Sequence, residues 1–492
     1  MSDLSAHPTV ADRDDWPDLP WPLVICGYFA LQVIWRRLLG AGPNLDEAEI
    51  LLWSRHLALG YGPQPPLYSW LQWAFLQAIP DALLALSLLK NLLLAATYLA
   101  VWRLLRCVHP DRIAGPAALA LFLVPQVSWD SQRDLTHSVL ATALAATAAL
   151  TFWTRTLPGQ RGGWALLGLL TGLGLLAKPN FLLVPATFVL AALSLAELRG
   201  RIAPRGLVVA AGIATAVVAV PLAWALEHPE LAFASTHKLA MATGPGPTAA
   251  AAGLAELARA LVDLLLLTAI VVGGIAFLRR RTATAAPAPG PFERWLLRAI
   301  LIGVGIATLG VIASGTTNIR SLWLLPLVYL AAPLAAVRLL QRTGASGARA
   351  LLYTIAGLAL LVFLALGVAI RYGEPGNPAL YRAPVAEAAA DLVARFPDAD
   401  RIVAEPTWLA GSLLYYRPDL PVVSADDPGA APPPGTRVVA IWWDGDWRER
   451  ITAALARAWG EPVALGTPEA TTRAFPLQPD EPFETQAAEV TR

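Results

Sequence analysis

The sequence has few charged residues and almost no cysteine. Only 15% of its 492 residues are Asp, Glu, Lys or Arg, whereas 56% are hydrophobic. A soluble domain rarely tolerates that balance, so the composition favours a polytopic α-helical membrane protein over a globular one. The two cysteines, Cys26 and Cys107, fit neither a disulfide framework nor a thiolate metal site.

An excess of charge of either sign is also lacking. The formal net charge is +1, which gives no sign of a polyanionic partner, and no nucleic-acid motif is present. The first twenty residues lack the basic segment that opens a cleaved signal peptide. We therefore expect the first apolar run to remain as an anchor, with residues 1–20 as a cytoplasmic tail and no nucleic-acid partner.

Long apolar runs are what the chain has instead. A helix needs about 20 apolar residues to cross the hydrocarbon layer of a membrane. Runs of this kind predict about eleven transmembrane helices within a domain over residues 21–371. The expected spans are 21–40, 82–104, 113–128, 135–153, 163–177, 179–197, 206–226, 260–278, 295–313, 321–338 and 350–370.

The distribution of Lys and Arg predicts the orientation. One set of loops carries sixteen of these residues and the opposite set nine, and the richer side is expected to be cytoplasmic. The N-terminus then lies inside and residues 372–492 lie outside. Arg36 and Arg37 go against this rule, which suggests another role for them. The expected external loops are 41–81, 129–134, 227–259 and 314–320.

The composition changes after Tyr372, where proline and charge increase. Short β-branched runs at 401–405, 421–425, 437–443 and 462–466 predict strands, and 384–395, 407–416 and 447–459 predict helices. Asp446, Glu449 and Gly460 are suitable as caps of the last helix. We expect a small extracytoplasmic α/β domain that serves as a lid or an acceptor platform, because no catalytic or phosphate-binding motif occurs in it.

Polar side chains collect on the predicted outer face. Ionisable groups at membrane depth usually line a cavity or pair with one another, which favours a functional polar chamber. For any single residue, a solvated loop is the alternative. The residues are Asp46, Glu47, Glu49, Asp130, Asp134, Glu227, Glu230, His56, His137, His228 and His237.

The most polar stretch follows the first span and reads LDEAEILLWSRHLALGYGPQPPL from Leu45 to Leu67. An Asp-Glu pair followed by an amphipathic helix over 53–71 resembles the first external loop of family 39 glycosyltransferases. These GT-C membrane enzymes include protein O-mannosyltransferases and lipid A aminoarabinose transferases. Residues 129–150, 172–186 and 318–333 also resemble bacterial members, so the resemblance covers about residues 20–370.

The resemblance implies a GT-C fold and transfer of a sugar from a polyprenyl phosphate to a hydroxyl acceptor at the external membrane face. By position in the motif, Asp46 matches the catalytic general base, and Glu47 would orient it or hold a sugar hydroxyl. Asp134 matches an acidic position that binds acceptor or sugar. From the residues alone, the alternative for Asp46 and Glu47 is a helix N-terminus favoured by the macrodipole. The alternative for Asp134 is an N-cap of the span that begins at Leu135.

The leaving phosphate needs cations or hydrogen-bond donors. Lys178, which precedes a proline between two short spans, and Arg320 are favoured as donor-phosphate ligands, and each basic residue could instead snorkel to lipid headgroups. The further phosphate candidates are Arg55, Gln64 and Arg259, and the acceptor or sugar candidates beside Asp134 are His56, His137 and Asn180.

Pro63 and Gln64 replace the Glu-Lys or Asp-His pair that relatives carry before Pro65 and Pro66. Proline cannot ligate a metal, so we predict no metal site and no required cofactor. The departure also weakens any transfer of aminoarabinose specificity.

The acceptor stays open between a glycolipid such as lipid A, a polysaccharide and a protein. We expect a multi-pass protein of the bacterial inner membrane whose partners are the lipid-linked donor, the acceptor and membrane lipid. A transporter or flippase for a lipid-linked saccharide is the competing hypothesis, although no inverted repeat is visible.

Overall fold

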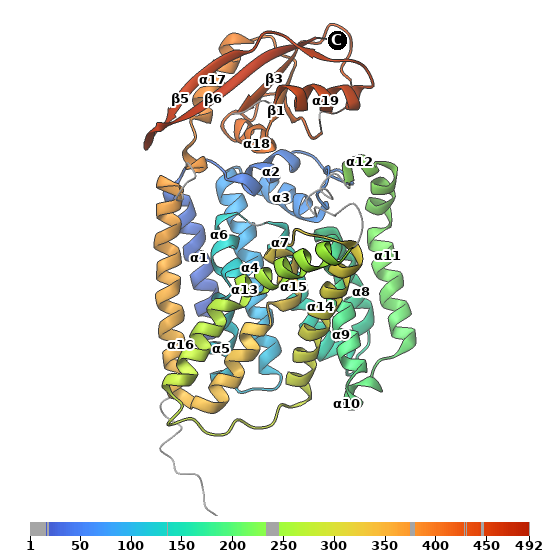
Figure 1. Ribbon diagram of the computed structural model, residues 1–492, viewed down its shortest axis with the longest axis vertical. Helices are drawn as coiled ribbons and strands as arrows, with labels where there is room; N and C mark the ends of the chain where they lie inside the picture. Colours follow the sequence, from blue (N-terminus) through green and yellow to red (C-terminus); the bar gives the residue numbers. More distant parts are fainter. Residues whose placement is uncertain are drawn as a thin grey trace, which may run out of the picture.

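The computed structural model describes residues 16, 19–134, 136–232, 246–373, 379–427, 429, 431–443 and 447–491. It consists of a large helical body and a small domain of strands and helices stacked on one end of it (Figure 1). The helical body ends at Tyr372, in agreement with the change of composition at that residue.

The body is built from helices with short 3₁₀ and π segments between them. Their bounds are α1 Trp21–Leu39, α2 Leu45–Trp53, α3 Leu67–Ala78, α4 Ala82–Arg106, α5 Asp111–Leu119, η2 Ala120–Leu123, η3 Gln126–Asp130, α6 Ser131–Arg133, α7 His137–Thr151, η4 Phe152–Thr156, α8 Gly163–Ala177, η5 Pro179–Leu182, α9 Leu183–Leu193, α10 Ala196–Arg199, α11 Pro204–Glu227, α12 Pro229–Ala232, α13 Pro247–Leu278, α14 Pro291–Ser314, α15 Ser321–Val328 and α16 Ala331–Tyr372.

Six helices in the described part of the chain are long and apolar enough to cross a membrane. A seventh span results if the bent pair Asp111–Leu123 and Gln126–Arg133 is counted as one. Gly163–Ala177 and Pro179–Leu193 are shorter apolar helices. These helices agree with a polytopic membrane protein, whereas the number eleven stays a prediction.

The last two predicted spans share one helix. α16 runs through 42 residues, but Gly344 inside it has φ 60° and ψ −150°, which is not helical. Glycine tolerates this conformation because it has no Cβ atom. The kink divides α16 into a first part that continues α15 and a second part that corresponds to the predicted span 350–370.

The predicted amphipathic helix over 53–71 is wrong. α2 ends at Trp53 and α3 begins only at Leu67. Between them the chain turns, with Gly62 at φ 56° and an isolated bridge between Tyr61 and Gln64. Three prolines at 63, 65 and 66 lack the amide hydrogen that a helix requires, so the segment cannot remain helical. In Figure 1, α2 and α3 lie between the membrane helices and the small domain.

The small domain has a six-stranded sheet in the order β2-β1-β3-β6-β4, and β5 pairs with β6. β1 is parallel to β2 and β3, whereas β6 is antiparallel to β3. Its elements are η7 Leu380–Arg382, α17 Val385–Arg395, β1 Arg401–Glu405, α18 Thr407–Tyr416, β2 Val422–Ser424, β3 Val438–Trp443, α19 Arg448–Trp459, β4 Ala464–Leu465, β5 Glu469–Phe475 and β6 Gln478–Thr491.

Most of this domain agrees with the sequence prediction. The four predicted strands correspond to β1–β4 and the three predicted helices to α17–α19. Gly460 ends α19 with φ 70°, as predicted. The predicted N-terminal cap by Asp446 and Glu449 is wrong, because the N-cap is Trp447 and makes no side-chain capping hydrogen bond; Asp446 itself lies outside the described residues. The hairpin of β5 and β6 was not predicted.

One apolar core joins the small domain to α2. Ala48, Leu52 and Trp53 of α2 belong to the same buried cluster as Leu409 and Leu413 of α18. The approach is close: a Cβ atom added to Gly411 would lie 1.9 Å from the carbonyl oxygen of Ala48. The small domain therefore packs against the apolar side chains of α2. The polar N-terminus of α2 faces the helical body.

Candidate active site

The N-terminus of α2 is capped by Asn44 and Glu47. The carboxylate of Glu47 accepts a hydrogen bond from the backbone N–H of Asn44 at 3.2 Å, which completes a capping box. Asn44, rather than Asp46, is the N-cap, and Asp46 lies in the first turn of α2, where the helix macrodipole favours a carboxylate. Its carboxylate is left available for another role.

Glu47 is held by two cations from other helices. Arg36 Nη2 lies 3.0 Å from Oε2, and Lys90 Nζ lies 3.4 Å from Oε1. Burial opposes ionisation of Glu47, but Arg36 and Lys90 outweigh it and lower the pKa of Glu47 to about 2. Its side chain is only 2% exposed. The contacts of both carboxylate oxygens hold Glu47, and with it the N-terminus of α2, in place.

Asp46 and Asp134 are brought together although 88 residues separate them. The backbone N–H of Asp46 donates to Oδ1 of Asp134 at 2.8 Å. Thr136, rather than Asp134, is the N-cap of α7, so the cap alternative for Asp134 is wrong. Residue 135, where that span was predicted to begin, lies outside the described residues.

The carboxyl group of Asp46 has a strongly perturbed titration. Burial raises the pKa of Asp46 well above its ordinary value, and Asp134 and Glu49 raise it further, whereas Lys90 and a backbone hydrogen bond from Thr136 act in the opposite direction. Burial also raises the pKa of Asp134. A carboxylate with a raised pKa is a stronger base than an ordinary aspartate, which suits general-base chemistry.

Lys178 lies at the break between the helices α8 and η5, and Asn180 is the second residue of η5. Lys178 is extended, with φ −160° and ψ 127°, as expected before a proline. Its Nζ donates to Ser138 Oγ at 2.9 Å and to the carbonyl oxygen of Leu322 at 3.0 Å. Asn180 Nδ2 donates to the carbonyl oxygen of Trp323 at 2.8 Å. These bonds tie the break to α7 and to the first turn of α15.

Arg320 immediately precedes α15 and is exposed. It is therefore adjacent in the chain to the carbonyl groups that Lys178 and Asn180 contact. Lys178 also lies close enough to Asp46 for the two opposite charges to interact. Two of the predicted phosphate ligands, Lys178 and Arg320, thus belong to one neighbourhood beside the predicted base.

Buried polar groups with unmet hydrogen-bonding capacity surround this neighbourhood. Tyr68 and Gln72 of α3 are fully buried, and within the described residues neither the Tyr68 hydroxyl nor the Gln72 amide has a hydrogen-bond partner. The ring of His137 lies 5.5 Å from that of Tyr68, centroid to centroid. Buried polar groups are normally satisfied. Water or a bound substrate would supply the partners, in agreement with the predicted polar chamber.

An apolar groove of about 270 Å³ opens next to the break at Lys178. Pro179, Trp224 and further apolar side chains of α8 and α11 line it, and Gln64 is a polar residue of the lining. Gln64 therefore borders an apolar surface. Close packing shapes the groove, because a Cβ atom on Gly60 would lie 1.9 Å from the ring of Trp224.

Three predicted residues lie elsewhere. Arg55 donates to the carbonyl oxygen of Leu420 at 3.3 Å, and Arg55 and His56 border a cavity of about 370 Å³ against β2 of the small domain. Arg259 pairs with Glu256 of the same helix at 3.0 Å, and its side chain is 70% exposed. The structure does not bring these three into the Asp46 cluster. Residues 233–245 of the predicted loop 227–259, including His237, lie outside the described residues.

Lys90 and Tyr68 were missed by the sequence reasoning. A signal existed for Lys90, since it is a lone charge within the apolar run of α4, and such residues are usually functional or paired. Arg36 and Arg37 have the separate role that their position suggested: Arg36 binds Glu47, and Arg37 pairs with Asp81 at 2.7 Å. Within the described ranges, no group of three or more His, Cys, Asp and Glu side chains could hold a metal ion.

The chain is similar in sequence to known glycosyltransferases. Residues 63–224 match the family model described as dolichyl-phosphate-mannose-protein mannosyltransferase. The lipopolysaccharide core galacturonosyltransferase RgtB of Rhizobium johnstonii is 32% identical, with 86% of this chain and 87% of RgtB covered. RgtA of the same organism, also named a lipopolysaccharide core galacturonosyltransferase, is 33% identical, with 88% of each chain covered.

Solved structures show the same fold. ArnT from Cupriavidus metallidurans in the apo state superposes with a TM-score of 0.61 at 13% identity, covering 95% of this chain and 97% of ArnT. The structure of the same protein bound to undecaprenyl phosphate gives a TM-score of 0.59 at 13% identity and the same coverage.

Proposed function

This chain belongs to the GT-C family of membrane glycosyltransferases that includes the lipopolysaccharide core galacturonosyltransferases, and we propose that it transfers galacturonic acid from a polyprenyl phosphate to a hydroxyl group of the lipopolysaccharide core. Family membership confirms the predicted enzyme class over the transporter alternative.

The observation that carries the proposal is the meeting of Asp46, Asp134 and Lys178. Asp46 and Asp134 are joined by the 2.8 Å hydrogen bond from the Asp46 backbone, and Lys178 interacts with the Asp46 carboxylate. The cluster holds a base for the acceptor and a cation for the leaving group. An inner-membrane enzyme with a lipid-linked donor needs both groups at one level of the membrane.

The reaction then has three coupled changes. The acceptor hydroxyl oxygen attacks C1 of the sugar, the bond from C1 to the phosphate oxygen breaks, and polyprenyl phosphate leaves with the bonding electron pair. The hydroxyl proton passes to the Asp46 carboxylate. Lys178 and Arg320 stabilise the negative charge on the departing phosphate, and Asn180 and Gln64 are available as hydrogen-bond donors beside it.

The apolar groove beside Lys178 suits the polyprenyl chain of the donor. It is lined by the loop before α3 and by α11. Pro179, which also lines it, directly follows the cationic residue Lys178. ArnT has been solved with undecaprenyl phosphate, which supports a lipid of this class as donor. Asp134 and His137 are then left for the sugar or the acceptor, and His137 is next to Ser138, whose Oγ accepts a hydrogen bond from Lys178.

An envelope glycolipid is the acceptor that the relatives favour. RgtA and RgtB are named for transfer to the lipopolysaccharide core, and an acceptor of this kind is itself anchored at the outer face of the inner membrane. We therefore place the active face and the small domain on the periplasmic side. The loop positions with fewer Lys and Arg residues support this orientation.

Reconstitution tests the reaction. The full-length protein in lipid nanodiscs should add one sugar to purified lipopolysaccharide core when given undecaprenyl-phosphate galacturonate, detected by mass spectrometry of the product. The mannose and aminoarabinose donors serve as matched controls and should give little product. Transfer to a protein Ser or Thr with no gain on lipopolysaccharide would refute the proposed acceptor.

Orientation needs a separate test. A reporter that is active only in the periplasm should be active when fused after Arg371 and silent when fused after Arg280. The reverse pattern would place the Asp46 cluster on the cytoplasmic side and overturn the proposed location.

A further inference from the structure

Tyr381 is a buried residue of the small domain that lies among the elements of the Asp46 cluster. It belongs to η7, the first described element after α16, and it is only 5% exposed. Its side chain packs with Leu366 and Ile370 near the end of α16. A buried tyrosine hydroxyl usually finds a hydrogen-bond partner, so the partner of this hydroxyl indicates the role of Tyr381.

The hydroxyl of Tyr381 caps the end of α6. It donates to the carbonyl oxygen of Arg133 at 2.5 Å, and α6 ends at Arg133. Carbonyl groups in the last turn of a helix have no partner within that helix. The Arg133 carbonyl shares one rigid peptide plane with the N–H of Asp134, which donates to the carbonyl oxygen of Asp130 at 2.9 Å. Both sides of the plane that leads into Asp134 are therefore fixed, one of them by the small domain.

The backbone and the ring of Tyr381 contact the chain that leads into α2. The carbonyl oxygen of Tyr381 accepts a hydrogen bond from the N–H of Gly42 at 2.7 Å. Cζ of Arg36 lies 5.1 Å from the centre of the Tyr381 ring, and Arg36 in turn binds Glu47 and the carbonyl oxygen of Gly42. Tyr381 therefore contacts the segment that leads into α2 as well as the one that leads into α7.

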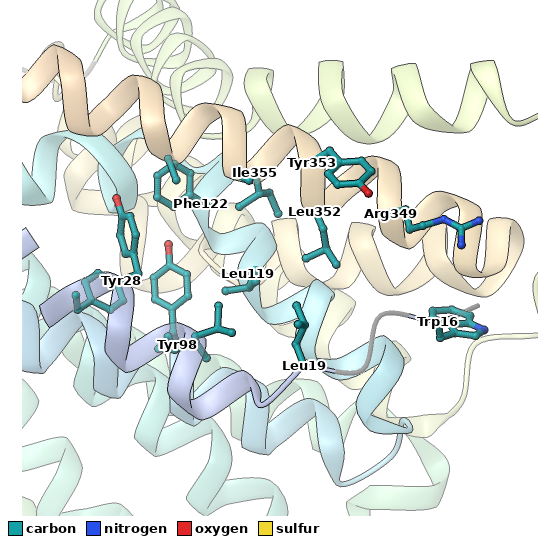
Figure 2. A pocket seen from close by; sticks show the side chains of 15 residues that line it. Trp16, Leu19, Tyr28, Tyr98, Leu119, Phe122, Arg349, Leu352, Tyr353 and Ile355 are labelled. Atoms are coloured by element: carbon teal, nitrogen blue, oxygen red, sulfur yellow. The ribbon is translucent and has the colours of Figure 1, made fainter. Parts of the chain in front are cut away.

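The two ends of α1 are held differently. Toward its N-terminus, α1 borders a cavity of about 670 Å³, where Figure 2 shows Tyr28 and Tyr98 among mostly apolar side chains. Side chains that line a cavity lack protein partners on that side. At the other end, Nη2 of Arg382 donates to the carbonyl oxygen of Leu39 at 3.0 Å. The small domain therefore supplies contacts at the end of α1 that carries Arg36.

We propose that Tyr381 is a positioning residue for the transfer reaction, whose hydroxyl holds the Asp134 segment while its ring and backbone hold the Asp46 segment against it. The hydroxyl is buried and bonded to a backbone carbonyl, so Tyr381 acts through the two aspartates rather than on the substrates. The small domain thereby completes the active site. This inference rests on the proposed function for the chemical roles of Asp46 and Asp134, whereas the contacts themselves are independent of it.

Hydrogen exchange measures the contact without an activity assay. The Asp46 N–H lies in the first turn of α2, where it has no partner within the helix, and it donates to Asp134 instead. Tyr381→Phe keeps the ring and the backbone carbonyl but removes the hydroxyl. In full-length protein in nanodiscs, exchange of the Asp46 amide should accelerate about fivefold, the equivalent of one net hydrogen bond. The Gly42 amide, whose acceptor is the backbone of residue 381, is the internal control and should exchange as in the wild type.

Kinetics separates positioning from a general loss of structure. kcat of Tyr381→Phe should fall at least tenfold, because misplacement of a reacting group by about 1 Å can cost 10²-fold. Affinity for undecaprenyl phosphate should stay at the wild-type value, because the lining of the apolar groove does not include Tyr381. Tyr353→Phe, at an exposed tyrosine of α16, is the matched control and should leave both quantities unchanged.

Each contrary outcome has a distinct meaning. Unchanged exchange of the Asp46 amide in Tyr381→Phe, or a wild-type kcat, would overturn the proposal. Equal acceleration at Asp46 and Gly42 would show general loosening and would overturn it as well. Acceleration confined to Asp46, in a protein whose wild type transfers no galacturonate, would refute the proposed function and uphold the contact.

Discussion

Nζ of Lys90 lies 3.4 Å from Oε1 of Glu47, and both side chains are only 2% exposed. Lys90 belongs to α4 and Glu47 to α2, so the pair connects a transmembrane helix to the loop that carries Asp46. Arg36 of α1 binds the second carboxylate oxygen of Glu47. Three elements therefore meet at one carboxylate, and the position of Asp46 depends on all of them.

Loss of the Lys90 charge should change the pH dependence of transfer. Lys90 favours the ionised form of Asp46 and so limits the upward shift of the Asp46 pKa. Without that charge the pKa of Asp46 rises further, and since only the ionised carboxylate accepts a proton, activity should be lost at a higher pH on acidification. The measurement is the pH profile of kcat/KM for Lys90→Gln.

The conservative variant separates electrostatics from packing. Lys90→Arg keeps the positive charge and should keep the acid limb of the wild-type profile. A uniform loss of activity at every pH in Lys90→Gln, with no shift of the limb, would mean that Lys90 only supports the fold.

Replacement of Lys178 should weaken transition-state stabilisation. Gln at this position can still donate to Ser138 Oγ but cannot neutralise phosphate. Loss of a preorganised donor to developing charge costs roughly 10²–10³ in rate, so Lys178→Gln should lower kcat/KM by about that factor. Arg259→Gln is the control and should be nearly silent, because Arg259 is 70% exposed and paired with Glu256. Equal effects of the two variants would contradict the assignment.

The contact between Gly411 and Ala48 should be important to activity, because Ala48 lies two residues from Asp46 in α2. The Cβ atom of Gly411→Ala would lie 1.9 Å from the Ala48 carbonyl oxygen, so α18 and α2 must separate. Asp46 then loses its position relative to Asp134. Transfer should fall at least tenfold, since misplacement by about 1 Å can cost 10²-fold.

The matched control for this contact is another helical glycine. Gly212 in α11 has open space where its Cβ atom would be, so Gly212→Ala should keep wild-type activity. Wild-type turnover by Gly411→Ala would show that the small domain does not support α2.

Glu405 should make the stability of the small domain depend on pH. Burial raises the pKa of Glu405 from 4.5 to about 7, Asp426 raises it further, and Arg450 opposes the shift. Because the folded-state pKa is raised, the stabilising contribution is present below about 4.5 and is lost as the pH rises through about 7. The difference is on the order of 3 kcal/mol from 1.36 kcal/mol per pKa unit.

Hydrogen exchange of the β1 amides reports this change directly. Protection in the wild type should be greater at pH 5 than at pH 8, after correction for intrinsic exchange rates. Glu405→Gln cannot ionise and should remove most of that difference. A pH dependence that is unaltered in the variant would assign it to another group.

Local patterns in the sequence were sufficient for much of the fold. The strand at Arg401–Glu405 and the helix at Thr407–Tyr416 agree with their predicted ranges, because short β-branched and helical runs there are bounded by proline. β6 was not predictable in the same way. It contains Pro479 and Pro482 with several charges, which are unfavourable in a strand, and its pairing with β3 and β5 is a tertiary contact.

The candidate site likewise combines residues that local motifs identify with contacts that only the tertiary structure creates. Asp46 was identified because its motif is local, whereas its contact with Asp134 spans 88 residues. Lys90 lies within an apolar span, away from the loops and span ends, so its contact with Glu47 is evident only from the tertiary structure. Arg55 is close to Asp46 in sequence, yet the turn after Trp53 directs it toward the small domain. Sequence proximity was therefore a poor guide to which polar residues meet.

Replacement of Asp46 by Asn should remove the base without disturbing the helix that carries it. Asn44 and Glu47 already cap α2, so Asp46→Asn removes no cap, and the backbone N–H that binds Asp134 remains. The amide keeps the size of the carboxylate but cannot accept a proton. Loss of a general base typically costs 10²–10⁴-fold, and kcat of Asp46→Asn should fall by about that factor while donor affinity stays near the wild-type value. Donor affinity is measured by binding of undecaprenyl-phosphate galacturonate and kcat by product formation. Because the cap is intact in this variant, near-wild-type turnover would leave no role for Asp46 as the base and would move that role to Asp134.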